Sequence, residues 1–262
     1  MVEVDIRVAV QSLAWGNPKG DAFVRWLDEV VEGGYEGISC FARDMIGFHD
    51  HPAVLRDLLE TRNLGLAALT GFVSDDLETM EQNMRFMAAL GAKHLACTDF
   101  DTELTRRQGA DKLNEAGKRS KQYGVNVYYH NHDGGIAGSL TELNELMGML
   151  DFNEVHLMLD VGHATQDFVE LPAAERAITF LRNHWDRIEY LEFKDYNDIT
   201  KLNTPVGEGL ADYPAIFELI KTRGYHTWIT VEQNGHTGWS LGRSPLETAK
   251  ISREYIRRGL GV

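Results

Sequence analysis

Strand-like and helix-like segments alternate along the whole 262-residue chain, which constrains the fold more than any other feature of the sequence. We expect strands at 4–10, 35–40, 64–69, 93–98, 125–130, 154–160, 187–194 and 226–232. We expect helices at about 21–32, 52–62, 75–90, 102–123, 139–150, 173–184, 213–223 and 245–258. Regular alternation favours a parallel sheet, and eight such units of this total length are typical of a (β/α)8 TIM barrel. The sequence therefore predicts one α/β barrel domain spanning residues 1–262.

Composition narrows the class of protein and its partners. The chain is 43% hydrophobic and 25% charged, as in ordinary globular proteins, and its net charge is −14. Such an acidic chain repels phosphate backbones, so we expect no nucleic-acid partner. Apolar runs are too short to cross a bilayer, and the first residues do not resemble a signal peptide. We therefore expect no membrane association, a cytoplasmic location, a small-molecule ligand and, as an open alternative to a monomer, a homo-oligomer.

Four strands in the second half of the chain end in side chains that bind metals: His130, Asp160, Glu192 and Glu232. The carboxyl ends of all strands meet at one mouth of a barrel, so these four side chains should converge. Alternate residues of a strand share a face, which puts a further set inside the barrel. The predicted inward residues are Asn126, Tyr128, His156, Met158, Ile188, Tyr190, Trp228 and Thr230. The remaining strand positions are nearly all apolar, with Glu189 as the awkward outward residue.

This ligand set determines the expected cofactor. Three carboxylates and one imidazole suit one hard divalent cation, with Mn²⁺ expected first and Mg²⁺, Co²⁺ or Zn²⁺ as alternatives. Such an ion can bind two oxygens of a sugar or polyol and stabilise an enediolate-type intermediate after proton abstraction next to a carbonyl.

Other side chains near the strand ends are candidates for substrate binding and proton transfer. His132 and His163 follow proposed ligands and can bind hydroxyl groups or move protons. Lys194 shares a face with Glu192 and can bind the substrate by neutralising an oxyanion. The predicted catalytic residues are Glu232, His130, His163 and Lys194, and the expected base is Glu232 or a site histidine. Trp15 and Glu208 are expected to contact substrate from loops, with packing on the barrel rim or loop shaping as the alternatives.

Five short motifs at these strand ends carry a resemblance to a known family. They are Tyr129-His130-Asn131-His132-Asp133, Leu159-Asp160-Val161-Gly162-His163, Phe193-Lys194-Asp195, Pro205-Val206-Gly207-Glu208-Gly209 and Val231-Glu232-Gln233. Together they resemble the xylose isomerase-like TIM-barrel superfamily of sugar isomerases and epimerases, which includes inosose dehydratases and endonuclease IV-type nucleases. In that family, strands five to eight usually supply Glu, Asp, His and Glu to one metal. At the matching positions of this chain, His130 and Glu192 have exchanged the imidazole and the carboxylate.

The resemblance implies a metal-dependent sugar or keto-polyol isomerase or epimerase. Because His130 replaces one of the paired carboxylates typical of the epimerases, isomerisation or loss of water is favoured over C3 epimerisation. The alternative is an inosose-like keto-cyclitol dehydratase or a keto-glycoside lyase, and the Tyr-His-x-His string is similar to the inosose dehydratase branch. A non-catalytic sugar-binding barrel and an endonuclease are less favoured.

Overall fold

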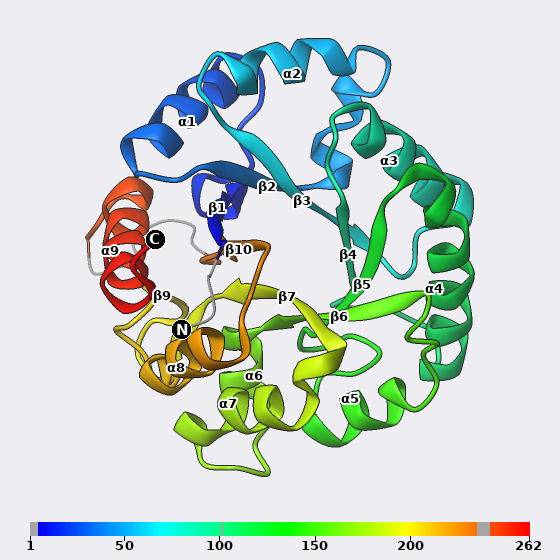
Figure 1. The fold of residues 1–262 in the computed structure, drawn as a ribbon, viewed down its shortest axis with the longest axis vertical. Coiled ribbons are helices and arrows are strands. Elements are labelled where there is room, and N and C mark those ends of the chain that lie inside the picture. The colour runs from blue at the N-terminus through cyan, green and yellow to red at the C-terminus, as the bar shows by residue number, and fades with distance from the viewer. Residues whose placement is uncertain (1–4, 101, 235–241) are drawn as a thin grey trace.

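The chain folds into a closed barrel of parallel strands surrounded by helices (Figure 1). The computed structural model describes residues 5–100, 102–234 and 242–262. Around the barrel the strands follow the order β1-β10-β7-β6-β5-β4-β3-β2, and β1 pairs with β10 to close it. Their bounds are β1 Arg7–Gln11, β2 Gly37–Phe41, β3 Gly65–Phe72, β4 His94–Thr98, β5 Asn126–His130, β6 Val155–Asp160, β7 Ile188–Phe193 and β10 Trp228–Val231. The predicted (β/α)8 architecture is confirmed.

The helices form the outer layer of the barrel (Figure 1). Their bounds are α1 Asp21–Glu32, α2 Pro52–Glu60, α3 Leu77–Ala89, α4 Arg106–Ser120, α5 Leu140–Met147, α6 Val161–Asp167, α7 Ala173–His184, α8 Tyr213–Arg223 and α9 Pro245–Leu260. The sequence gives no separate sign of α6, because it follows β6 without a loop. It also gives no sign of the antiparallel hairpin of β8 (Asp195–Asn197) and β9 (Lys201–Thr204). None of the helices in the described ranges is both long and apolar enough to cross a membrane.

Local signals set several helix ends. Thr105, Ser139 and Ser244 each form a capping box, in which the hydroxyl accepts a backbone N–H three residues later and a Gln or Glu side chain accepts the cap's own N–H. The Thr105 cap explains why α4 starts at Arg106, later than the start near residue 102 expected from the sequence.

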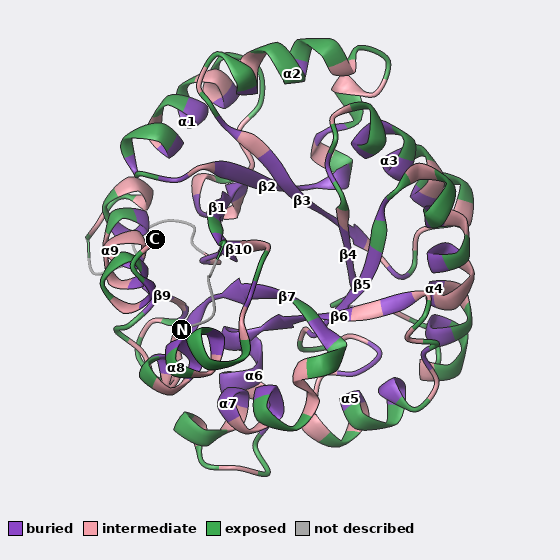
Figure 2. Ribbon diagram, in the orientation of Figure 1, coloured by how far each residue is buried: buried purple, intermediate pink, exposed green. Residues whose placement is uncertain are grey.

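Strand parity divides the core into an outer layer under the helices and a cluster inside the barrel. The inner cluster contains Ala68, Ala96, Tyr128, Met158 and Tyr190, with Trp228 packed against it. Figure 2 shows the barrel strands as mostly buried, with exposure concentrated on the outer faces of the helices. The inward positions predicted for β5, β6 and β10 are confirmed for Tyr128, Met158 and Trp228.

The prediction is wrong at the start of β7. Leu157 pairs with Ile188 but the next residue, Met158, pairs with Tyr190, so Glu189 is an extra residue in the ladder. A bulge of this kind reverses the parity of the residues before it. Ile188 therefore packs in the outer core, and the Glu189 carboxylate lies 3.1 Å from Nδ1 of His156.

Candidate active site

Three of the four predicted metal ligands meet at the carboxyl ends of the neighbouring strands β5, β6 and β7. His130 Nε2 lies 3.2 Å from a Glu192 oxygen and 3.5 Å from an Asp160 oxygen. All three side chains are buried, and one ligand atom from each lies within 4.8 Å of the others. The tertiary structure thus brings together an imidazole and two carboxylates that are 30 or more residues apart in sequence.

Glu232 joins this group through Lys194. The Lys194 ammonium lies 2.5 Å from a Glu232 oxygen and 3.5 Å from an Asp160 oxygen, and its side chain is 1% exposed. Glu232 itself is outside the close group formed by the other three predicted ligands. The structure therefore places an ammonium, which the sequence predicted only as an oxyanion partner, between two of the four expected ligands.

Burial and mutual charge set the protonation of this cluster. Burial opposes protonation of His130, but the nearby Glu192 and Asp160 carboxylates raise its pKa to about 10. Burial and the charge of Glu232 raise the pKa of Glu192 to about 8. Although burial also acts against charge on Lys194, the Glu232 and Asp160 carboxylates raise its pKa above the usual value. The carboxylates of the site therefore carry more negative charge than the Lys194 ammonium balances. Protons bound to His130 and Glu192 neutralise part of the excess.

The donor atoms of the cluster fit a divalent cation. In the described part of the chain, one Asp160 oxygen, both Glu192 oxygens and both His130 nitrogens are buried without a hydrogen-bond partner of good geometry. Buried polar atoms are normally satisfied, so such a concentration of orphan donors and acceptors needs an explanation. Imidazole nitrogen and carboxylate oxygen are ordinary ligands of Mn²⁺, Co²⁺ and Zn²⁺.

A second cluster lies beside the first, built from His132, His163, Asp133 and Asp167. Both histidines lie close to the Asp133 carboxylate, at 2.9 Å from His132 Nδ1 and 3.4 Å from His163 Nδ1. His163 Nδ1 is also 3.2 Å from Asp167, and the two imidazole rings are 3.9 Å apart. The hydrogen bond from His132 is the main cause that lowers the pKa of Asp133 to about 2. A fixed negative charge therefore stands beside the His132 imidazole.

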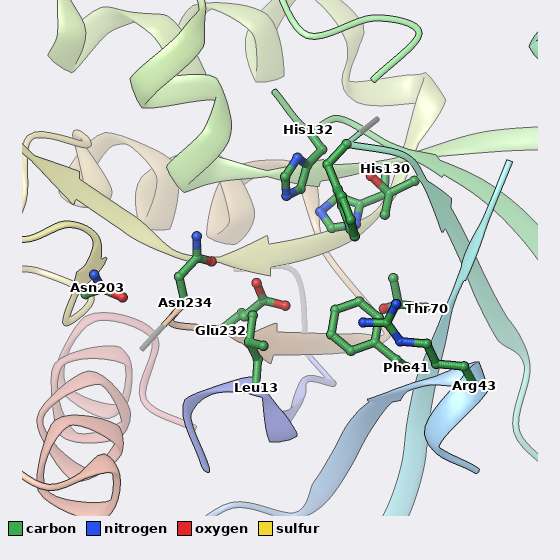
Figure 3. A pocket seen from close by; sticks show the side chains of 11 residues that line it. Leu13, Phe41, Arg43, Thr70, His130, His132, Asn203, Glu232 and Asn234 are labelled. Carbon is green, nitrogen blue, oxygen red and sulfur yellow. The ribbon is translucent and has the colours of Figure 1, made fainter. Parts of the chain in front are cut away.

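A pocket of about 410 Å³ opens above these clusters (Figure 3). Three residues expected from the sequence line it: His130, His132 and Glu232. The rest of its wall was not predicted from the sequence and consists of Leu13, Phe41, Arg43, Thr70, Thr98, Phe100, Asn203 and Asn234. Thr70 and Thr98 lie two residues after the inward-facing Ala68 and Ala96, so strand parity could have identified them. Four other predicted site residues, Asp160, His163, Glu192 and Lys194, are buried and are not part of the pocket wall.

Two expected substrate contacts lie elsewhere. Trp15 ends the short 3₁₀ helix Ser12–Trp15, and Gly16 follows in a left-handed turn with φ of 72°. The Trp15 indole N–H donates to Glu29 at 2.7 Å, and its ring packs against Trp26 of α1. Glu208 accepts a 2.7 Å hydrogen bond from Arg243. Neither Trp15 nor Glu208 lines the pocket, and the substrate contacts expected of them stay a prediction.

Comparison with known proteins gives the family. The family described as xylose isomerase-like TIM barrel matches residues 27–259. The chain belongs to this family. It is also 25% identical to an inosose dehydratase of Serratia proteamaculans, in an alignment that covers 98% of this chain and 99% of the relative. The relatives found by sequence similarity include inosose dehydratases, and this chain aligns with them over nearly their whole length.

Solved structures agree with this fold. A 3-keto-D-glucoside 4-epimerase from E. coli superposes with a TM-score of 0.76 at 14% identity, covering 97% of this chain and all of that one. An IOLI protein with a bound zinc atom superposes with a TM-score of 0.71 at 16% identity, covering 97% and 98% of the two chains. At such low identity these likenesses establish the fold alone. A divalent metal is consistent with the His130–Asp160–Glu192 cluster.

Proposed function

We propose that this protein is a divalent-metal-dependent lyase that removes water from a six-membered-ring keto-polyol, a keto-cyclitol of the inosose class or a close relative. The observation that carries the proposal is the orphaned His130–Asp160–Glu192 cluster directly beneath a pocket whose wall holds two proton-transfer groups, Glu232 and His132. Full-length similarity to inosose dehydratases supports dehydration over the isomerase or epimerase reaction that the sequence first favoured.

Glu232 is the proposed base. Its carboxylate faces the pocket and accepts a hydrogen bond from the buried Lys194 ammonium. Lys194 holds this carboxylate in one position, so that an oxygen can take the proton from the carbon next to the substrate carbonyl. Positioned general bases contribute about 10²–10⁴-fold to such steps.

His132 is the proposed acid. The Asp133 carboxylate lies 2.9 Å from Nδ1 of His132 and orients the imidazole, while the ring reaches the pocket wall. His132 would give its proton to the hydroxyl group that leaves from the next carbon. The substrate then loses one proton and one hydroxide in total, and the products are a conjugated ketone and water.

His130, Asp160 and Glu192 are the residues proposed to hold the metal ion. When bound, a divalent ion supplies Lewis-acid stabilisation of the negative charge that develops on the carbonyl oxygen. Lys194 would contribute a second positive charge beside Asp160 and Glu232.

An isomerase or epimerase is the second candidate. The pocket presents two proton-transfer groups from different strand ends, Glu232 after β10 and His132 after β5. With this pair, the abstracted proton could be returned to a substrate carbon without loss of the hydroxyl group.

The decisive experiment combines metal analysis with a reaction assay in D₂O. The purified protein should retain about one divalent ion per chain, and Asp160→Asn should lose it. A panel of keto-cyclitols that includes inosose should give a near-ultraviolet enone signal that EDTA abolishes and Mn²⁺ or Co²⁺ restores. Glu232→Gln should lower kcat by about 10²-fold or more.

The surface variant Asp111→Asn, on the exposed face of α4, is the matched control and should change neither metal content nor rate. Deuterium incorporation into the substrate without an enone signal would favour the isomerase or epimerase. Full activity in excess EDTA would contradict metal dependence altogether.

A further inference from the structure

Arg43 lies in the pocket wall at a position that neither the predicted site nor the metal cluster includes. It belongs to the short 3₁₀ helix Ala42–Asp44, which follows β2 directly. Figure 3 shows its side chain beside Phe41 and Thr70, on the side of the pocket away from Asn203. Among the described residues that line the pocket, Arg43 is the one Arg or Lys.

Arg43 is solvent-exposed, and its guanidinium lies near two aromatic rings. Its central carbon lies 5.0 Å from the ring of Phe41 and 5.2 Å from the ring of Phe72. The two rings are nearly parallel, with an interplanar angle of 5° and centroids 6.2 Å apart. Cation–π contact uses the flat face of a guanidinium and leaves its N–H edge available for hydrogen bonds.

The N–H edge of Arg43 has no partner within the described parts of the chain. No carboxylate oxygen there lies within 4.0 Å of its nitrogens, and its guanidinium makes no hydrogen bond to described residues. Two carboxylates in the neighbouring wall are engaged elsewhere. Asp44 pairs with Lys19 at 3.2 Å, and Asp75 accepts the Phe72 backbone N–H at 3.0 Å.

The charge balance of the site indicates what kind of group the Arg43 guanidinium would bind. Asp160, Glu192 and Glu232 carry three negative charges, which Lys194 and one divalent ion would balance. Arg43 would then be a further positive charge in the pocket wall, although the whole chain carries a charge of −14. A neutral polyol would not use this charge, whereas an anion would form charge-assisted hydrogen bonds with it.

We infer that the substrate carries an anionic group, a carboxylate or a phosphate, and that Arg43 binds this group and determines specificity for it. The inference rests on the proposed function and narrows its substrate from keto-cyclitols in general to anionic ones. The carbonyl lies over the His130–Asp160–Glu192 cluster, and the anion lies at the aromatic wall.

Binding of unreactive ring polyols to the metal-loaded protein tests this inference. Calorimetry would compare quinate, which carries a carboxylate, and myo-inositol 1-phosphate with neutral myo-inositol. At least one anionic probe should bind about 10-fold or more tightly than inositol, as expected for charge-assisted hydrogen bonds. Arg43→Gln should bring the affinity for that probe down to the affinity for inositol.

Arg25→Gln is the matched control, because it removes the same charge from an exposed position on α1 and should keep the preference. A preference for quinate alone assigns the anion as a carboxylate, and one for the phosphate alone assigns it as a phosphate. Equal binding of charged and neutral probes, or a preference that survives Arg43→Gln, would overturn the inference. Metal content measured on the same samples reports on the proposed function separately, since loss of metal would refute that function and not the role of Arg43.

Discussion

At the scale of single residues, Lys194 sets the charge of the barrel mouth. Its ammonium is buried between Asp160 and Glu232, so it partly balances carboxylates that would otherwise repel one another. Removing one partner from a buried ion pair leaves an uncompensated charge, which is more costly than the pair is favourable. A bound divalent ion would take over part of this balancing role.

We predict that Lys194→Met destabilises the metal-free protein strongly. The free energy of unfolding in EDTA, measured with urea, should fall by about 3 kcal/mol or more, because Glu232 and Asp160 lose their cation. Mn²⁺ should then raise the Tm of the variant more than that of the parent protein. Lys201→Met, at an exposed 3.8 Å pair with Asp198, should cost under about 0.5 kcal/mol. An equal loss in both variants would show that Lys194 is not a structural counter-charge.

At the scale of elements, α6 shows why the Asp160-Val-Gly-His163 motif has its spacing. The Asp160 carboxylate caps the helix by accepting the His163 backbone N–H at 2.9 Å, so a proposed ligand is also a structural cap. Gly162 lies against Lys194, and an added Cβ would be 2.7 Å from Cγ of that side chain. The glycine therefore lets α6 approach β7 and keeps Lys194 extended toward Glu232.

We predict that Gly162→Ala displaces Lys194 and weakens the site. Overpacking should lower the free energy of unfolding by about 1–3 kcal/mol, and metal affinity should change because Lys194 moves relative to Asp160. Gly47→Ala is the control, since nothing lies within 4 Å of its added Cβ. Calorimetric metal titration and urea unfolding of both variants would check this. Unchanged affinity and stability in Gly162→Ala would contradict the prediction, because they would show that an added methyl group fits between α6 and Lys194.

The loop that follows β9 depends on Asp195. Its carboxylate accepts backbone N–H groups of Tyr196, Gly207, Gly209 and Ala211 at 2.9–3.2 Å. An added Cβ at Gly209 would overlap this carboxylate. The Lys194-Asp195 and Gly207-Glu208-Gly209 motifs thus form one structural unit in which Asp195 and the glycines shape the loop.

At the scale of the whole molecule, the two ends of the barrel have different roles. Catalytic groups of TIM barrels lie at the carboxyl ends of the strands, whereas the opposite end contributes to stability. At that opposite end, His94 Nδ1 lies 3.0 Å from the Tyr128 hydroxyl, and its ring lies 5.0 Å from the ring of Tyr190. Burial lowers the pKa of His94 to about 4.

We predict that His94 makes the barrel less stable in mild acid. The unfolded chain takes up a proton near pH 6.5 and the folded chain only near pH 4, so this contribution is complete above pH 6.5 and is lost as the pH falls. Between pH 7 and pH 4.5 the loss should be about 2.5 kcal/mol. Urea unfolding of His94→Gln should show a correspondingly smaller pH dependence. His226→Gln, at an exposed position, should behave as the parent protein does, and an unchanged dependence in His94→Gln would contradict the prediction.

The sequence by itself determined the eight alternating units and most of the strand faces. Helices α1, α7 and α8 begin and end where their patterns predict, because hydrophobic periodicity and caps are local. Parity and the common direction of the strands were enough to predict that His130, Asp160 and Glu192 converge.

Only the tertiary structure decided the features that depend on register and on loops. One extra residue, Glu189, reverses the face of Ile188, and the only sign of it in the sequence is a charged residue at a position expected to be apolar. Trp15 packs against α1 through Glu29 and Trp26, whereas Arg43 reaches the pocket from a 3₁₀ helix that is too short to show a periodic pattern. The distances between side chains that meet across the barrel depend on how strands and loops pack in space. The spacing of residues along the chain does not determine that packing.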